Sequence, residues 1–358
     1  MIKRILFAFV LTLSSLVLFA QETDSVKIAM AQRAEEAEKL YNEGVNLFDQ
    51  KDYNGAITKY NNAINLKSDF NKAYFNRGLA KFELKDYNGA IKDYSKVIEI
   101  APNSEKAFFK RGETKYVLND KDGALKDYSR AIEIDPKYAS AYYNHGSLYF
   151  EKGDYKAALK DFNTCISLKP NENAYYYNDR ASTKLKLGMD AKEIISDYNK
   201  ALDINPRLAF VYNNLGSVLK KTKDYDGALT QYTMAIKMKP DYYVAYNNRG
   251  DLKFIQGKYQ EAISDFTEAI KINPDYAYAY NNRGNAKYKI NDYKGAIADY
   301  DAAIKINPKY GYAFLNRGIS REMTRDAAGC CSDWNIAKSL GVTVADNFLS
   351  TSCEDQKK

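Results

Sequence analysis

The single histidine and the four cysteines are the residues of this chain best suited to chemistry. His145 stands sixteen residues before Asp161, so an imidazole and a carboxylate recur at a fixed spacing. The sequence has no nucleophile elbow, no HExxH and no phosphate-binding loop. No CxxC or Cys/His spacing suggests a metal site. We therefore expect a protein with no catalytic residues, no metal and no cofactor, and hence no enzyme.

The spacing of His145 and Asp161 returns along the chain in other charged pairs. An arginine precedes an aspartate by sixteen residues, or once by seventeen, at Arg77/Asp93, Arg111/Asp127, Arg180/Asp197, Arg249/Asp265, Arg283/Asp299 and Arg317/Asp333. Glu43/Lys59 reverses the charges, and Leu215/Gln231 carries none. Because the two positions change together, we expect a half-buried ion pair between two helices, in which the arginine fork grips the carboxylate. His145 then has a structural role opposite Asp161.

These pairs follow a longer period, which defines the elements that must position them. Glycines recur every 34 residues, with 35 on either side of Ala181, at Gly44, Gly78, Gly112, Gly146, Gly216, Gly250, Gly284 and Gly318. A small residue mostly lies 12 positions after each glycine, an aromatic 16 after it and a proline 24 after it. Each unit thus predicts two helices joined by a turn, with the proline ending the second helix. Such a hairpin cannot bury its apolar face alone and must stack on its neighbours.

On these residues, from 37 to 341, the chain resembles the tetratricopeptide-repeat (TPR) family. The resemblance implies an all-α fold, an α-α superhelix or solenoid of nine helix-turn-helix repeats. We expect the repeats at 37–70, 71–104, 105–138, 139–173, 174–208, 209–242, 243–276, 277–310 and 311–341. A helical lead-in would occupy 21–36, and a capping helix with the C-terminal tail 342–358. The fifth repeat departs from the pattern, with Ala181 for glycine, Ile194 for alanine and an extra residue in its turn.

The resemblance also implies a concave groove lined by the first helix of each repeat. When the glycine is numbered 8, position 6 is mostly asparagine, and position 5 is also asparagine in later repeats. A primary amide can pair with the backbone of an extended peptide whatever its side chains. The alternative is that asparagine is simply common there in the family. The candidate partner-binding residues are Asn42, Asn76, Lys106, Lys110, Asn144, Asn213, Asn214, Asn247, Asn248, Asn281, Asn282 and Asn316.

A second family device is represented only in part. TPR co-chaperones hold acidic C-terminal tails with a five-residue carboxylate clamp, and Asn76, Lys106 and Lys110 match three of its positions. Tyr41 and Val45 replace the other two, so the clamp is incomplete. The net charge of +7 is modest for a chain of this length, and the basic residues are interspersed with acidic ones rather than gathered in a stripe. We therefore expect no nucleic-acid partner.

The first twenty residues have the pattern of a secretory signal. "MIKR" is followed by the uncharged apolar run 5–20, which is short for a membrane span. We expect cleavage after Ala20, with retention as an anchor as the alternative. The mature chain would then have no membrane span and lie in the periplasm of a Gram-negative bacterium.

The cysteines fit such an exported chain. Cys165 stands where most repeats have alanine, so we expect it to be buried. Either Cys330 or Cys331 is expected to form a disulfide with Cys353 and staple the capping helix to the last repeat. The resulting hypothesis is a scaffold that binds a protein or peptide in a Tyr/Asn-lined groove. The alternatives are an assembly subunit of an envelope complex and a glycan-binding module.

Overall fold

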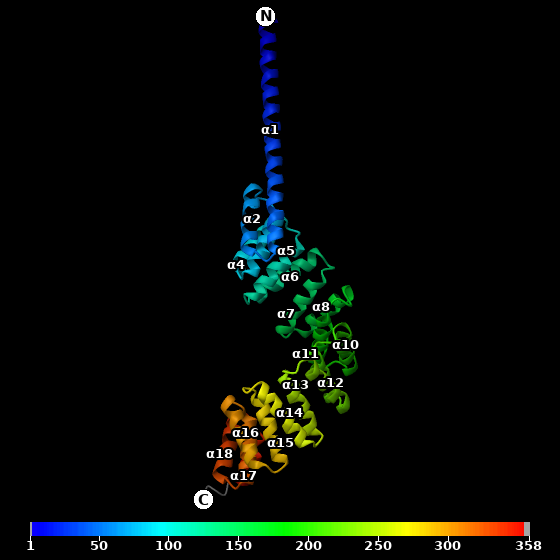
Figure 1. The fold of residues 1–358 in the computed structure, drawn as a ribbon, viewed down its shortest axis with the longest axis vertical. Helices are drawn as coiled ribbons and strands as arrows, with labels where there is room; N and C mark the ends of the chain where they lie inside the picture. Colours follow the sequence, from blue (N-terminus) through cyan, green and yellow to red (C-terminus); the bar gives the residue numbers. More distant parts are fainter. Residues whose placement is uncertain (1, 354–358) are drawn as a thin grey trace. The chain divides into compact units, whose positions relative to one another are not determined.

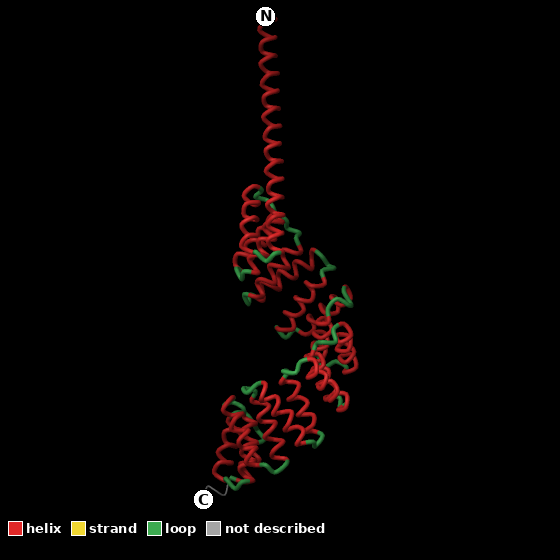
Figure 2. Tube along the Cα trace, in the orientation of Figure 1, coloured by secondary structure: helices red, strands yellow, loops and turns green. Residues whose placement is uncertain are grey.

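The computed structural model describes the backbone of residues 2–353 and the side chains of residues 26–353. The expected signal segment with its cleavage point, and the last five residues of the tail, lie outside the described side chains. Within the described residues the chain consists of nineteen helices and no strand (Figures 1 and 2). The helices are α1 Ile2–Asp49, α2 Tyr53–Leu66, α3 Asn71–Glu83, α4 Tyr87–Ile100, α5 Glu105–Val117, α6 Lys121–Ile134, α7 Ala139–Glu151, α8 Tyr155–Leu168, α9 Ala174–Lys186, α10 Ala191–Ile204, α11 Ala209–Lys221, α12 Tyr225–Met238, α13 Tyr243–Ile255, α14 Tyr259–Ile272, α15 Ala277–Lys289, α16 Tyr293–Ile306, α17 Gly311–Met323, α18 Ala327–Ser339 and α19 Ala345–Ser352.

The odd-numbered helix and the following even-numbered helix form a hairpin from α1/α2 to α17/α18, and each pair after the first lies within one expected repeat. In most hairpins the last residue of the short turn is also the N-cap of the second helix. In α4, Asp86 is the N-cap, and its carboxylate accepts a hydrogen bond from the Gly89 N–H at 2.9 Å. The residue before it, Lys85, has a left-handed backbone with φ of 63°. An aspartate cap of this kind precedes most of the second helices, but Lys258 at the start of α14 makes no such bond.

Close approach of the two helices explains the repeated glycine. A Cβ atom added at Gly284 would lie 2.7 Å from Cε1 of Tyr300, which is too close for any side chain. The Tyr300 ring is buried between α15 and α16 together with Ala296 and Ala303. The small residues therefore let the helices meet, and the aromatic ring fills the space between them.

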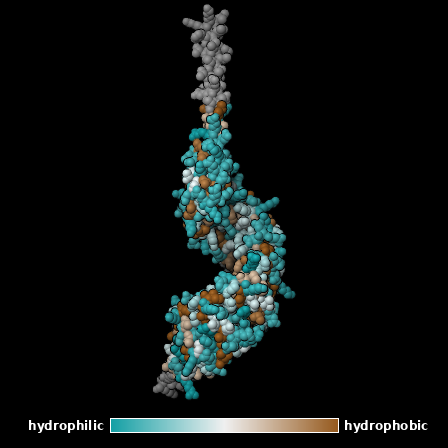
Figure 3. All heavy atoms as spheres, in the orientation of Figure 1, coloured by the Kyte–Doolittle hydropathy of each residue, from teal (hydrophilic) through white to brown (hydrophobic). Residues whose placement is uncertain are grey.

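The chain divides into two compact units, Met1–Lys169 and Pro170–Lys358. In each unit successive hairpins pack on one another, and the visible surface is mainly hydrophilic with separate apolar patches (Figure 3). The second unit ends in α19, where Phe348 stacks on the buried Trp334 with ring centroids 5.1 Å apart. None of the helices searched in the described part of the chain is long and apolar enough to cross a membrane.

A disulfide joins Cys331 of α18 to Cys353, directly after α19. Their Cα atoms lie 5.9 Å apart. Cys330, the other partner left open by the sequence, is buried as a thiol, and so is Cys165. The bond therefore ties the end of α19 to the last hairpin.

Candidate partner-binding surface

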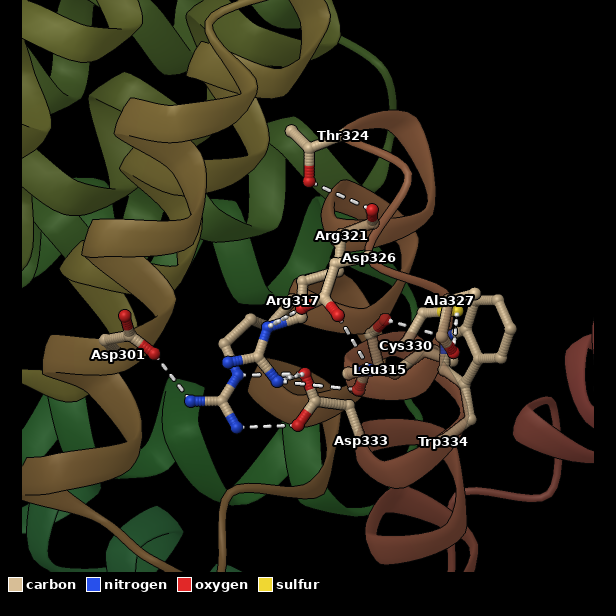
Figure 4. Close-up of polar contacts among 11 residues, drawn as sticks. Asp301, Leu315, Arg317, Arg321, Thr324, Asp326, Ala327, Cys330, Asp333 and Trp334 are labelled. Atoms are coloured by element: carbon tan, nitrogen blue, oxygen red, sulfur yellow. Dashed lines mark hydrogen bonds and ion pairs between the residues drawn. The ribbon is translucent and has the colours of Figure 1, made fainter.

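The repeated arginine and aspartate bind each other within every hairpin that has both. In Figure 4, Arg317 of α17 approaches Asp333 of α18 with its Nε at 2.9 Å and its Nη2 at 2.6 Å from the two carboxylate oxygens. The same two-point contact occurs in the other five arginine–aspartate pairs. The reversed pair is also made, with 2.6 Å between Lys59 and Glu43. The pairing predicted from the sequence is confirmed.

Each of these aspartates has a second cationic partner that sequence reasoning missed. Arg321 Nη1 lies 2.9 Å from Asp333, and Lys287 Nζ lies 2.8 Å from Asp299. The second cation stands four residues after the arginine, on the same face of the first helix. The repetition of Lys or Arg at that position was the signal that could have revealed it.

The arginines also reach back to the preceding repeat. Arg317 Nη1 contacts Asp301 of α16 at 2.5 Å, and Arg111 Nη1 donates to Ser95 of α4 at 3.0 Å. One guanidinium therefore joins three helices, and its three nitrogen atoms are already engaged within the chain. The arginines are part of the architecture of the solenoid.

His145 takes the place of an arginine in this arrangement. Its Nδ1 lies 2.8 Å from Asp161, and its Nε2 lies 3.0 Å from the hydroxyl of Ser129. Serine, histidine and aspartate thus stand in the order of a hydrolase triad. The Ser129 hydroxyl, however, donates to the Leu125 carbonyl at 2.9 Å, and this serine occupies the same repeat position as Ser95. The predicted contact between His145 and Asp161 is confirmed.

The paired asparagines of the second unit form a ladder between first helices. Nδ2 of Asn248 donates to Oδ1 of Asn213 at 2.9 Å, so position 6 of one repeat bonds to position 5 of the repeat before. Three further rungs of 3.0 to 3.3 Å follow the same rule: Asn214 to Asn178, Asn282 to Asn247 and Asn316 to Asn281. In the first unit Asn76 donates in the same way to the Tyr41 hydroxyl at 2.9 Å.

The ladder changes the interpretation of the position-5 amides. Asn213, Asn247 and Asn281 are buried, with only 4 % of Asn281 exposed, so these side chains offer almost no surface to a partner. The position-6 amides are half-buried and use one N–H for the ladder. The ladder partner of each position-6 asparagine lies about one period earlier in the sequence, so comparison of positions within a single repeat did not reveal it. Alignment of each position 6 with the preceding position 5 would have shown it.

Three pockets lie along the first-helix side, and each is lined by three consecutive first helices. The α3 pocket has a volume of about 250 Å³, and Tyr41, Asn76 and Lys106 each contribute to it from a different first helix. The α5 pocket measures about 310 Å³ and includes Lys110 and Asn144. The α15 pocket, of about 200 Å³, lies in the second unit and includes Asn316.

The pockets bring together some of the residues predicted from the sequence and leave others apart. Asn76, Lys106, Lys110, Asn144 and Asn316 line them, whereas Asn42 is exposed on α1. The remaining asparagines belong to the ladder. A lining by tyrosine was expected, but its individual residues were not named in advance. The aromatic and aliphatic lining consists of Tyr41, Phe75, Phe82, Val97, Tyr116, Val117, Tyr128, Leu148, Phe254, Tyr288, Tyr300 and Ile319.

Burial controls the ionisation of the aromatic residues beneath this surface. It raises the pKa of the Tyr128 hydroxyl far above its ordinary value, so this group stays protonated. Among the residues that the structure describes, no three His, Cys, Asp or Glu side chains are grouped so that they could hold a metal ion.

Helical hairpins closed by internal ion pairs and joined by contacts between first helices define a helical-repeat solenoid. Models described as "TPR repeat" match residues 44–85, 115–151 and 250–291. Models described as "Tetratricopeptide repeat" match 72–104, 139–172, 211–242 and 277–310. Together the matches cover more than half of the chain, which belongs to the tetratricopeptide-repeat family. A comparison with curated protein sequences finds no match.

Solved structures share the fold at low sequence identity. A tetratricopeptide repeat protein from Parabacteroides merdae is 19 % identical with a TM-score of 0.54, covering 70 % of this chain and 98 % of that one. The structure of pilF from Pseudomonas aeruginosa is 21 % identical with a TM-score of 0.53, and the match covers 59 % of this chain and 96 % of that one. The structure of the APC/C hetero-tetramer Cut9–Hcn1 is 14 % identical with a TM-score of 0.56, and the match covers 89 % of this chain and 76 % of that one. At these identities the likeness concerns the fold.

Proposed function

We propose that this protein is a non-enzymatic scaffold that binds a segment of a protein partner along its first helices. The observation that carries the proposal is the lining of the three pockets by consecutive first helices. A segment that crosses several repeats would meet such a pocket at more than one of them. The fold by itself does not set the function, because solenoids of this family serve unrelated processes.

The pockets, rather than the asparagine ladder, are the basis of this proposal. The ladder amides of Asn213, Asn247 and Asn281 are buried and accept hydrogen bonds from the next repeat. Replacing them would loosen the contact between first helices, and a loss of binding would then have two explanations. Exposed residues at the pocket rims, such as Lys106 and Lys289, are better probes.

We further propose that the chain is exported, with residues 1–20 as its signal and the periplasm as its compartment. The disulfide between Cys331 and Cys353 supports this proposal, because such bonds persist in oxidising compartments and are rare in the cytosol. Fractionation of the native host, with gel mobility compared before and after reduction, tests it. A chain found only in the cytosol would contradict it.

Site-specific photo-crosslinking tests the binding surface. A benzophenone amino acid is placed at Lys106 or Lys289 in the full chain and irradiated in the native host. The control position is Ser196, which is exposed in a hollow of about 420 Å³ on α10, a second helix. We expect the same partner to be crosslinked from Lys106 and Lys289 but not from Ser196. Adducts from Ser196 alone, or none from either pocket position, would refute the proposal.

A further inference from the structure

The α5 pocket has a wall that is largely apolar. Its lining comes from Phe82 of α3, from Lys110, Glu113, Tyr116 and Val117 of α5, from Tyr128 of α6 and from Asn144, Ser147 and Leu148 of α7. Tyr128 and Leu148 are buried, whereas Val117 is 47 % exposed. A volume of about 310 Å³ is at the small end for ligand sites, which suits one large side chain better than a folded ligand.

The charged groups and the serine hydroxyl of this wall already have partners within the chain. Lys110 and Glu113 form an ion pair at 2.8 Å, and the Ser147 hydroxyl donates to the Tyr143 carbonyl at 2.9 Å.

The hydroxyl of Tyr116 is also engaged, because it donates to Glu151 of α7 at 2.6 Å. This bond crosses from one first helix to the next and fixes the ring at the edge of the pocket. A guest is therefore met chiefly by ring faces and aliphatic groups.

The charge of the pocket excludes a charged guest. Its one cation, Lys110, is bonded to its one anion, Glu113, so a buried carboxylate or ammonium would lose its hydration without gaining a partner. The α3 pocket differs, because it is lined by the exposed Lys72 and Lys106 and by no acidic residue. The two neighbouring pockets thus present different chemistry to one bound segment.

We propose that the α5 pocket holds a large uncharged apolar side chain, such as phenylalanine, leucine or methionine, of the bound protein segment. This inference rests on the proposed function and adds the class of side chain that the partner must present. Burial of that side chain against Val117, Tyr116 and Leu148 is the source of its affinity.

Small amides test the pocket without a known partner. N-acetylphenylalaninamide is titrated into the full chain with labelled leucine and valine methyl groups, and the Leu148 and Val117 resonances are followed. N-acetyl-lysinamide and N-acetylglutamic acid amide are the charged comparisons. The matched methyl control is Leu252, which has the same repeat position as Leu148 in the second unit and lines none of the three pockets.

We expect the phenylalanine amide to shift Leu148 but not Leu252, with a dissociation constant of about 1 mM, as suits a fragment of this size. The charged amides should bind at least about fivefold more weakly, because their charge would have to be desolvated. V117E should weaken binding of the phenylalanine amide about tenfold by removing apolar contact. The control I255E changes an equally exposed residue at the same repeat position and should have no effect.

Equal binding of charged and apolar amides, equal shifts at Leu148 and Leu252, or full binding by V117E would overturn the proposal. An unchanged resonance of Leu125, which packs against the core of the same hairpin from α6, shows that this part of the V117E variant is folded. Crosslinked partners without guest selectivity would overturn the pocket assignment alone. Selective guest binding without any crosslinked partner would overturn the proposed function and leave the pocket preference standing.

Discussion

Removal of the repeated arginine is the sharpest test of the architecture. In the eighth hairpin Asp299 is 4 % exposed, and its carboxylate is held by Arg283 at 3.0 and 2.7 Å and by Lys287 at 2.8 Å. The change R283L leaves a buried carboxylate with Lys287 alone. Breaking a buried pair costs about 3–5 kcal/mol, and since one cation remains we expect about 2–3 kcal/mol.

The sixth hairpin provides the matched control, because its equivalent positions carry Leu215, Leu219 and Gln231. The triple variant R283L/K287L/D299Q transfers this uncharged set to the eighth hairpin. No charge is then buried without a partner, and we expect stability within about 1 kcal/mol of the parent chain. The single variant should therefore be less stable than the triple variant.

Hydrogen exchange of the amides in α15 and α16 measures these effects. A repeat protein of this length does not unfold in one step, so a single melting temperature would not report on one hairpin. Local exchange gives the free energy of opening for the altered hairpin, with α3 and α4 as the unchanged reference. A cost below about 1 kcal/mol for R283L, or a triple variant as unstable as the single one, would refute the buried-pair reasoning.

Three further predictions follow from single contacts. K258D should supply the missing cap of α14 and stabilise it by about 1 kcal/mol, measured by hydrogen exchange against K258A. Reduction, or the change C353S, removes a disulfide that closes a 22-residue loop and contributes about 3 kcal/mol to stability. Helix α19 should then loosen, and the fluorescence of Trp334, the only tryptophan, should shift to the red. An unshifted spectrum would contradict the contact between Trp334 and α19. Burial raises the pKa of Tyr60 and Tyr310 to about 12. The stability that these two residues contribute is therefore complete below pH 10 and is lost as the pH rises through 12. Ionisation of all tyrosines near pH 10 with the helicity intact would contradict this.

Most of the hairpin architecture could be predicted from the sequence because each repeat is an independent copy of the same solution. Glu43 with Lys59, and Leu215 with Gln231, show two positions changing together, and that change reveals a contact within one hairpin. The glycine and aromatic spacing likewise reports the close approach seen at Gly284 and Tyr300. These are local contacts, and they recur wherever the local sequence recurs.

The candidate site was harder to predict because it depends on contacts between repeats. Asn282 and Asn247 looked equivalent in the sequence, yet one is half-buried and donates while the other is buried and accepts. Which side of a first helix faces its neighbour depends on the rotation from one hairpin to the next. The repeat pattern alone does not specify that rotation.

The sequence by itself thus determined the repeat, the helices and the ion pair inside the hairpins, because all of these act within about 34 residues. Only the tertiary structure decided which asparagines bond to one another in the ladder, because each bond joins two successive first helices. It also decided where the pockets lie, because each pocket needs side chains from three first helices. It also decided that Cys331, rather than its neighbour, bonds to Cys353, since adjacent residues on a helix point about 100° apart.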